Sequence, residues 1–209
     1  MDRKLGRGRP LDRSRDGHIL HTAIGLLREV GFDAFRVQDV AERAKVGLGT
    51  MYRRWPTRDS LIVAAFGSVI GDVGVDDARD LDGLRRQLGE MADTLNTEQA
   101  DLLPGLIAAS HRDDDLAKAI GSALVHPRLT ALKTAVHATA GASLTDEEAG
   151  LLAEIGPGIL LLRLLLTQEP VTDDVVDRIV DELIRPLLVQ HSGTPVHPRR
   201  VGRLERQER

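Results

Sequence analysis

The chain has 209 residues, a formal net charge of −4 and no cysteine, which excludes disulfides and Cys-ligated metals. No run of 18 apolar residues occurs; the longest apolar stretch, Ile159–Leu166, is interrupted by Arg163. The basic N-terminus lacks the apolar core of a signal peptide. We therefore expect a soluble, cytoplasmic protein with no membrane partner.

Charge is divided unevenly along the chain. Residues 1–66 contain 13 Lys and Arg against 8 Asp and Glu, a net +5, whereas the remainder contains 15 against 24, a net −9. A basic head on an acidic body is typical of a protein that meets a polyanion with one end only. The predicted divisions are a flexible basic arm at 1–15, a head at 16–56, a helical body at 57–191 and a disordered tail at 192–209.

The arm contains Gly6-Arg7-Gly8-Arg9-Pro10, two arginines among glycines and a proline. One interpretation is a solubilising tail. The other is that Arg7 and Arg9 insert into a narrow DNA minor groove, as basic arms of DNA-binding domains do. The second interpretation depends on a DNA-binding head.

The head begins with a helix that starts at Ser14 or Asp16 and stops at Gly31. Two short helical patterns follow in VQDVAERAKVGLGTMY, Val37 to Tyr52. The break between them is Lys45-Val46-Gly47, and the second helix spans Leu48–Arg54. This layout is a helix-turn-helix, in which the second helix enters the major groove of DNA.

The segment GFDAFRVQDVAERAKVGLGTMYRRWPTRDSL, Gly31 to Leu61, resembles the DNA-binding signature of the TetR (tetracycline-repressor-like) family of bacterial regulators. With the preceding helix, the resemblance covers roughly the first third of the chain. It implies an all-α fold, with a three-helix DNA-binding head and a variable helical body that binds ligand and dimerises.

The segment departs from the family pattern at two positions. Lys45 stands where the family usually has Gly in the turn, and a left-handed Lys costs on the order of 1 kcal/mol. Arg36 replaces the usual Ser or Thr cap, so it cannot accept a bond from the helix N–H groups. We expect both side chains to contact phosphates instead.

The remaining DNA contacts follow from the helix face. Leu48 and Gly49 are expected nearest the base edges, and Gln38 on a base or the backbone. Met51 and Trp55 face inward. The expected phosphate contacts, or residues available to DNA, are Thr50, Tyr52, Arg53, Arg54, Thr57 and Arg58.

The body is predicted to be helical throughout. Pro56-Thr57 breaks the chain, and Thr57 caps a helix to about Val69 that links head and body. Leucine-rich stripes follow from Leu81 to Val136, with a break or kink at Pro127. The last two helices span about 146–167 and 172–189, the first beginning at a Thr145 cap.

These last two helices are apolar on more than one side, which predicts a two-fold interface between two copies. The family resemblance implies the same pairing. The alternative is that both faces are buried within one monomer. The expected interface residues are Leu152, Ile155, Ile159, Leu162, Leu166, Val176, Ile179, Leu183 and Leu187.

All five aromatic residues lie at or before Phe66, so a pocket in the body would have no ring partners for flat aromatic ligands. An aliphatic or small polar effector is more compatible. The candidate apolar walls are Leu88, Met91, Leu95, Leu106, Leu124 and Leu132, and the candidate polar anchors are His111, His126, His137 and Arg163.

We predict no metal, cofactor or catalytic site. His111-Arg112-Asp113-Asp114-Asp115 is interpreted as a loop and an acidic first helical turn. The predicted function is a homodimeric regulator of transcription, a repressor that binds a near-palindromic operator and responds to a ligand. The alternatives are an activating or architectural DNA binder without an effector, and a protein-interaction module that no longer reads DNA.

Overall fold

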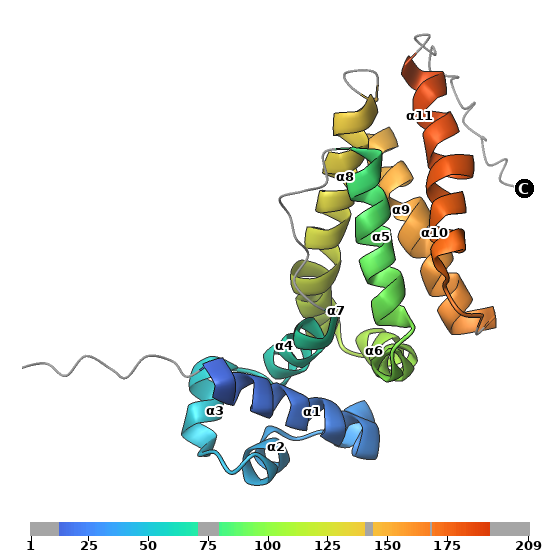
Figure 1. Ribbon diagram of the computed structural model, residues 1–209. Helices are drawn as coiled ribbons and strands as arrows, with labels where there is room; N and C mark the ends of the chain where they lie inside the picture. The colour runs from blue at the N-terminus through green and yellow to red at the C-terminus, as the bar shows by residue number, and fades with distance from the viewer. Residues whose placement is uncertain (1–12, 71–79, 141–143, 168, 193–209) are drawn as a thin grey trace, which may run out of the picture.

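The computed structural model describes residues 13–70, 80–140, 144–167 and 169–192. All regular structure in these ranges is helical, as the sequence predicts. The chain divides into a small head and a taller helical body (Figure 1). Residues 1–12 of the predicted arm and residues 193–209 of the predicted tail lie outside the described residues, whereas residues 13–15, also assigned to the arm, are helical.

The head consists of α1 (Arg13–Ala34), α2 (Val37–Arg43) and α3 (Leu48–Arg54). Gly31 has φ 72° and ψ 177°, which is not helical, so the first helix ends there as predicted and a second short helical turn follows across a kink. Only glycine reaches this conformation without steric cost. The turn after the kink directs Phe32 and Phe35 into the core, where both are buried.

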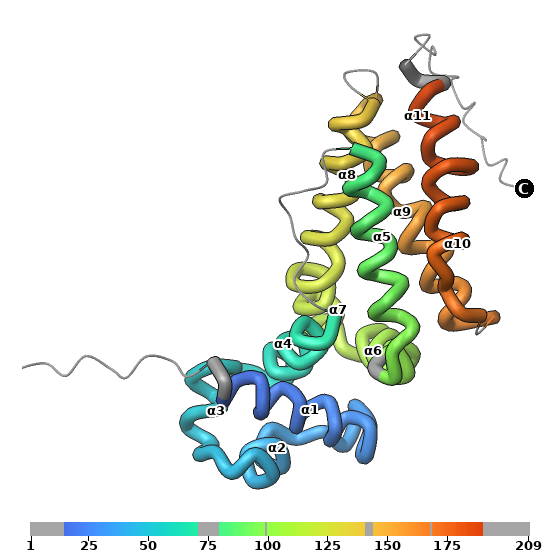
Figure 2. Tube along the Cα trace, viewed as in Figure 1, coloured from blue at the N-terminus to red at the C-terminus, as the bar shows by residue number. Residues whose placement is uncertain are grey.

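The body begins with α4 (Arg58–Ile70), followed by α5 (Leu81–Leu95), η1 (Glu98–Leu102), α6 (Leu103–Ser110) and α7 (Asp114–Ile120). The π-helical turn η2 (Gly121–Val125), α8 (His126–Ala140), α9 (Asp146–Leu162) and the π-helical turn η4 (Arg163–Thr167) come next. The chain closes with α10 (Asp173–Arg178), the π-helical η5 (Ile179–Ile184) and α11 (Arg185–Ser192). Helices α5, α8, α9 and α10–α11 stand side by side as a bundle, while α4, α6 and α7 lie between bundle and head (Figures 1 and 2).

Three prolines, Pro127, Pro157 and Pro186, lie inside helices without ending them. Pro127 lies two residues after the end of the π-helical turn η2, and Pro186 lies two residues after the end of η5. Proline lacks an N–H and clashes with the carbonyl four residues earlier, and a wider turn relieves that clash. The break predicted at Pro127 is therefore a local π-helical turn in a continuous helix.

The helix starts follow local rules. Thr145 and Glu148 form the predicted start of α9 as a full capping box: Thr145 Oγ1 accepts from Glu148 N at 3.3 Å, and Glu148 Oε2 accepts from Thr145 N at 2.9 Å. Thr57 caps α4 in the same reciprocal way with Ser60, at 3.0 Å in each direction. These local bonds fix where the helices begin.

Two apolar clusters form the core, and the boundary between them does not follow the domain boundary. The first joins α1–α4 to Leu102, Leu106, Leu116 and Leu124 of the body. The second fills the bundle. The head and the base of the body therefore share one continuous core.

Candidate nucleic-acid interface and body cavity

Helix α3 has one buried and one exposed face. Met51 is fully buried and Trp55 is 9% exposed, so both hold α3 against the head core as predicted. Leu48 and Tyr52 are 38% and 40% exposed, although Leu48 is a large apolar residue and Tyr52 is aromatic. Arg53 is also exposed. An outward face of this composition is suited to contact with bases and phosphates.

The turn before α3 is a Schellman motif built on a strained residue. Lys45 has φ 54°, the left-handed conformation expected from the family's usual Gly. Its N–H donates to Glu42 O at 3.2 Å, and Val46 N donates to Ala41 O at 2.9 Å. Val46 is half-buried against the head core, while Lys45 is exposed beside α3.

The start of α2 lies at the opposite end of that helix from this turn. Arg36 is extended at φ −130° and makes no side-chain cap, as its chemistry predicts. Arg36 and Gln38 are both exposed. The structure thus brings Arg36, Gln38 and Lys45 to the solvent side of the same helix-turn-helix.

Arg54, which the sequence predicts to be available to DNA, faces the interior of the head instead. Its Nη1 lies 2.6 Å from Asp16 Oδ1 of α1, and its side chain is only 11% exposed. A charge held inward by a carboxylate is not available to a phosphate. Arg54 fastens α3 to α1, whereas its neighbour Arg53 points outward.

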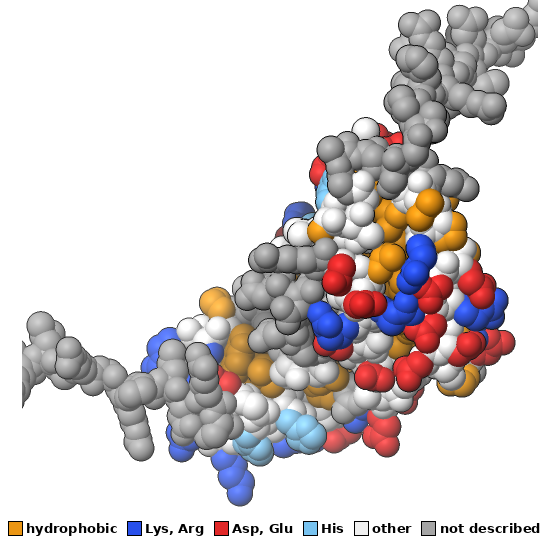
Figure 3. Space-filling view, turned by 45° about the horizontal axis from the view of Figure 1, so that its top comes forward, with side chains coloured by type: hydrophobic (Ala, Val, Ile, Leu, Met, Phe, Trp, Pro, Cys, Tyr) orange, Lys and Arg blue, Asp and Glu red, His pale blue; other side chains and the backbone are white. Residues whose placement is uncertain are grey.

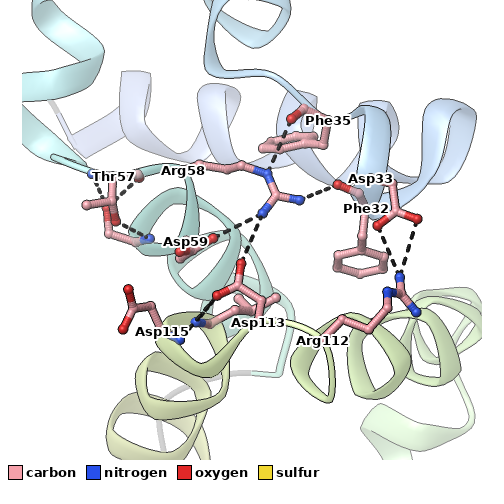
Figure 4. Close-up of polar contacts among 11 residues, drawn as sticks. Phe32, Asp33, Phe35, Thr57, Arg58, Asp59, Arg112, Asp113 and Asp115 are labelled. Carbon is pink, nitrogen blue, oxygen red and sulfur yellow. Dashed lines mark hydrogen bonds and ion pairs between the residues drawn. The ribbon is translucent and has the colours of Figure 1, made fainter.

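Arg58 is a second predicted DNA contact that the structure places elsewhere. Its guanidinium donates to the carbonyls of Phe32 and Phe35 at the end of α1, the latter at 3.3 Å, and to Asp59 Oδ1 at 3.2 Å (Figure 4). Its Nη1 also lies 3.9 Å from Asp113 Oδ2 in the α6–α7 loop. Arg58 was expected to hold a phosphate, but these partners make it a tie between head and body.

The carboxylates around Arg58 influence one another. Partial burial raises the pKa of Asp59, the nearby Asp113 charge raises it further, and Arg58 counteracts both. Asp113 Oδ1 accepts from Asp115 N and Leu116 N, both at 3.1 Å, and so caps α7. Beside it, Arg112 Nη2 lies 3.1 Å from Asp33 Oδ1 and ties the α6–α7 loop to the end of α1 (Figure 4).

The sequence predicts a basic head and an acidic body. Acidic side chains gather on the body, beside a few Lys and Arg (Figure 3). In the head, one basic residue of α2, Arg43, is paired with Glu29 at 2.5 Å. That pairing holds the pKa of Glu29 below its usual value. Arg7 and Arg9 lie outside the described residues.

The body contains a cavity of about 260 Å³ between α5, α6, α8 and α9. All six apolar residues named from the sequence line it: Leu88, Met91, Leu95, Leu106, Leu124 and Leu132. Pro157 and Leu161 of α9 form part of the wall. Gly156 lets α9 approach α5, since a Cβ there would lie 2.5 Å from Leu88 Cδ2.

None of the four polar anchors named from the sequence lines this cavity, which corrects that expectation. His111 and His126 are exposed, His137 Nε2 lies 3.5 Å from Asp146 Oδ1, and Arg163 pairs with Glu169 at 2.7 Å. The polar wall residues are instead Gln87, Glu90, Thr94, Ser110 and Arg128. Gln87, Met91 and Thr94 lie four and three residues apart, which places them on one face of a helix. That spacing could have indicated Gln87 as a wall residue.

The predicted dimer residues separate into two groups. Leu162, Leu166 and Leu183 are 52%, 74% and 44% exposed, and Ile155, Ile159 and Leu187 are partly buried. Leu152, Val176 and Ile179 are at most 7% exposed and belong to the core of one monomer, which corrects their assignment. Leu151 and Val189, at 62% and 66%, were missed.

Helix α9 with η4, Asp146–Thr167, is long and apolar enough by length and composition to cross a membrane. Its most apolar window has a mean hydropathy of 1.8 and is 28% buried. Helices in the core or at an interface of water-soluble proteins have the same composition. Among the residues that the structure describes, no group of three His, Cys, Asp or Glu could hold a metal ion.

Two family models match the chain. Residues 19–65 match "Bacterial regulatory proteins, tetR family", and residues 76–183 match "Tetracyclin repressor-like, C-terminal domain". The helix-turn-helix lies in the first and the cavity mostly in the second.

Relatives match over nearly their whole length. The uncharacterized HTH-type transcriptional regulator Rv1556 of Mycobacterium tuberculosis is 29% identical over 197 residues, 88% of this chain and 95% of that protein. The DNA-binding transcriptional repressor TetR of Mycobacteroides abscessus is 28% identical over 181 residues, 84% and 94%.

Solved structures share the fold. A putative TetR-family regulator from Mesorhizobium loti matches with a TM-score of 0.61 at 16% identity, over 85% of this chain and 96% of that chain. The TetR family transcription regulator SCO0332 matches with a TM-score of 0.59 at 24% identity, over 88% and 100%. Both halves of the chain, and the geometry of its helix-turn-helix, lead to one assignment: the protein belongs to the TetR family of DNA-binding transcriptional regulators.

Proposed function

We propose that the protein is a ligand-responsive homodimeric repressor that acts in the cytoplasm on a near-palindromic operator. The observation that carries this proposal is the outward face of α3, where Leu48 and Tyr52 stay exposed while Met51 and Trp55 are buried. Tyr52 is an exposed aromatic residue beside Arg53. Contact with DNA would explain it.

In this proposal each head inserts α3 into a major groove. Leu48 and Gly49 approach the base edges, because α3 begins there and Gly49 has no side chain to obstruct approach. Gln38 reaches a base or the backbone. Thr50, Tyr52 and Arg53 hold phosphates.

The flanking phosphate contacts come from three further places. Arg36 and Lys45 are exposed on either side of α2. Thr57 Oγ1 accepts from Ser60 N, which leaves the hydroxyl proton for a phosphate oxygen. Arg7 and Arg9 extend the contact into the adjacent minor groove.

Dimerisation in this proposal uses the uncovered apolar stripe of α9 and the exposed Leu183 beside it. Leu151, Ile155, Leu162 and Leu166 follow one another at spacings of four, seven and four, which places them along one side of the helix. A two-fold pairing would cover them. It would also present two α3 helices to half-sites about 34–36 Å apart, one turn of DNA.

The ligand response would pass through α6. Leu106 lines the cavity and belongs to the core cluster of the head. The same helix ends in the loop where Arg112 and Asp113 meet Asp33 and Arg58. Filling the cavity would displace α6 and tilt α4 and α1 together. Release from DNA requires the ligand to favour the non-binding state by a few kcal/mol.

The test is selection of bound fragments from genomic DNA by the purified full-length protein at near-physiological salt. We expect an inverted repeat. Tyr52→Ala should weaken binding to that repeat by about 1–3 kcal/mol without changing the oligomeric state. Flat affinity across sequences, with only a steep salt dependence, would reject a sequence-specific regulator.

A further inference from the structure

The first turn of α1 lies against the end of α3, and an ion pair joins the two helices (Figure 1). Arg54 Nη1 lies 2.6 Å from Asp16 Oδ1, and the two side chains are only 11% and 30% exposed. Arg54 is the last residue of α3, and Asp16 is the acidic residue in the first turn of α1. The contact therefore fixes where α1 starts relative to α3.

The hydrophobic core does not reach this turn. Among the side chains that the structure describes, that of Ile19 is the first in the chain to be fully buried, and Gly17 and His18 before it are exposed. A Cβ on Gly17 would meet nothing within 4 Å, and a glycine inside a helix weakens that helix. Ahead of Ile19, the position of α1 therefore depends on the ion pair between Asp16 and Arg54.

The geometry of the pair suits positioning better than stability. Arg54 Nε, Arg54 Nη1 and Asp16 Oδ1 are all buried without an aligned hydrogen bond. Two charges removed from water recover their lost hydration only when good hydrogen bonds complete the attraction, so a pair of this kind adds little stability. The best-attested effect of such pairs is on the relative placement of the elements that carry them.

The placement of this turn limits what the preceding residues can reach. Arg9 and Arg7 lie four and six residues before Arg13, the first residue of α1. A fully extended chain spans at most ~3.6 Å per residue, so their Cα atoms lie within about 14 Å and 22 Å of the Cα of Arg13. Neighbouring major and minor grooves lie about half a turn of DNA apart, ~17 Å. The two arginines can span that distance from a major groove occupied by α3 only when α1 starts beside α3.

We propose that Arg54 and Asp16 form a positioning pair for DNA recognition, which sets the start of α1 so that Arg7 and Arg9 enter the minor groove beside the base pairs contacted by α3. A narrow, A·T-rich minor groove concentrates negative potential and attracts arginine, so the protein selects A·T pairs in that flank. This inference rests on the proposed function, in which α3 occupies the major groove and the two arginines occupy the minor groove.

The experiment uses two duplexes that share the fragment bound most tightly in the selection. They differ only in the base pairs flanking the region that the protein protects, which are all A·T in one duplex and all G·C in the other. The flank ratio is the dissociation constant for the G·C duplex divided by that for the A·T duplex. Fluorescence anisotropy at fixed salt measures this ratio for the full-length protein.

The variants separate positioning from direct contact. Arg54→Met and Asp16→Ala each break the ion pair, and the double variant Arg7→Ala, Arg9→Ala removes the arm's charges. Arg53→Met is the matched control, because it makes the same substitution at the exposed neighbour of Arg54. Breaking the pair at Arg54 removes a positive charge, whereas breaking it at Asp16 removes a negative one. A simple effect of charge on phosphate attraction would therefore act in opposite directions in the two variants.

We expect a flank ratio of about ten for the unmodified protein and near one when Arg7 and Arg9 are replaced. Arg54→Met and Asp16→Ala should each lower the ratio by roughly threefold or more, because the arm's arginines are no longer directed into the groove. Arg53→Met should weaken binding to both duplexes equally and leave the ratio unchanged.

The proposal is overturned if the unmodified protein binds both duplexes equally, if the ratio survives the loss of Arg7 and Arg9, or if either ion-pair variant keeps the full ratio. A ratio that falls in Arg54→Met but rises in Asp16→Ala would make Arg54 a direct DNA contact instead. Each of these results, with tight binding to the selected fragment retained, rejects the positioning role and leaves the proposed function standing. Equal binding to the selected fragment and to unrelated DNA rejects the proposed function, and the positioning role with it.

Discussion

Arg58 of α4 and Asp113 of the α6–α7 loop lie 3.9 Å apart, Nη1 to Oδ2, at the place where the body meets the head. The same guanidinium bonds two carbonyls at the end of α1. One side chain thus joins the first helix of the head, the connecting helix and the helix that lines the cavity. This junction is where a change in the body would first reach the DNA-binding surface.

Arg58→Ala should lower the free energy of unfolding by about 1–3 kcal/mol, because it leaves the carbonyls of Phe32 and Phe35 without their donor. Urea denaturation measures this. Arg53→Ala is the matched control. It should change stability by no more than about 0.5 kcal/mol while weakening DNA binding. If Arg58→Ala were neutral for stability and Arg53→Ala were not, the two roles would be reversed.

Lys45→Gly should raise the free energy of unfolding by about 1 kcal/mol, since glycine adopts φ 54° without the clash of a Cβ. The same change should weaken operator binding and reduce the slope of log affinity against log salt by about 1, because one phosphate contact is lost. A more stable variant with an unchanged salt slope would remove Lys45 from the DNA contacts.

Leu162→Glu should weaken self-association at least tenfold, because it would bury an unpaired carboxylate in the proposed interface on α9. Sedimentation velocity measures the effect. Val30→Glu, at an apolar position of the head that is 41% exposed, is the control and should leave association unchanged. Equal association of both variants would place the interface elsewhere.

Gly156→Ala should destabilise the fold by about 1–3 kcal/mol, since its Cβ would lie 2.5 Å from Leu88 Cδ2 and force α5 and α9 apart. Gly150→Ala on the same helix meets nothing within 4 Å. It should instead stabilise α9 by about 0.5–1 kcal/mol. Thermal unfolding of the two variants should therefore shift in opposite directions.

Asp59→Asn should raise stability at neutral pH. The pKa of Asp59 is raised in the folded state, so the ionised carboxylate favours unfolding above that pKa. Below the unfolded-state pKa, Asp59 is protonated in both states and the advantage of Asn should vanish. Urea denaturation of both proteins at a series of pH values tests this. If the stability gained by Asp59→Asn grew as the pH fell, the pKa of Asp59 would not be raised by folding.

The sequence by itself determined the features that depend only on residues close together along the chain. The spacing of Val37, Val40, Ala41 and Ala44 predicts the first helix of the helix-turn-helix, because a helix buries one face at intervals of three and four. Lys45 in the left-handed turn and the Thr145 cap follow from backbone rules that neighbouring residues satisfy. The apolar cavity wall could also be predicted, because leucines at helical spacing must converge inside the bundle.

Only the tertiary structure decided where the polar side chains point. Arg53 and Arg54 are adjacent and chemically identical, yet Asp16 on another helix draws Arg54 inward and leaves Arg53 in solvent. Arg58 faces α1 for the same reason. A long charged side chain pairs with an opposite charge that lies near it in space. Which charge lies near depends on how helices that are distant in the sequence pack together. Which apolar face of α9 stays uncovered is decided in the same way, because neighbouring helices bury Leu152 and leave Leu162 exposed.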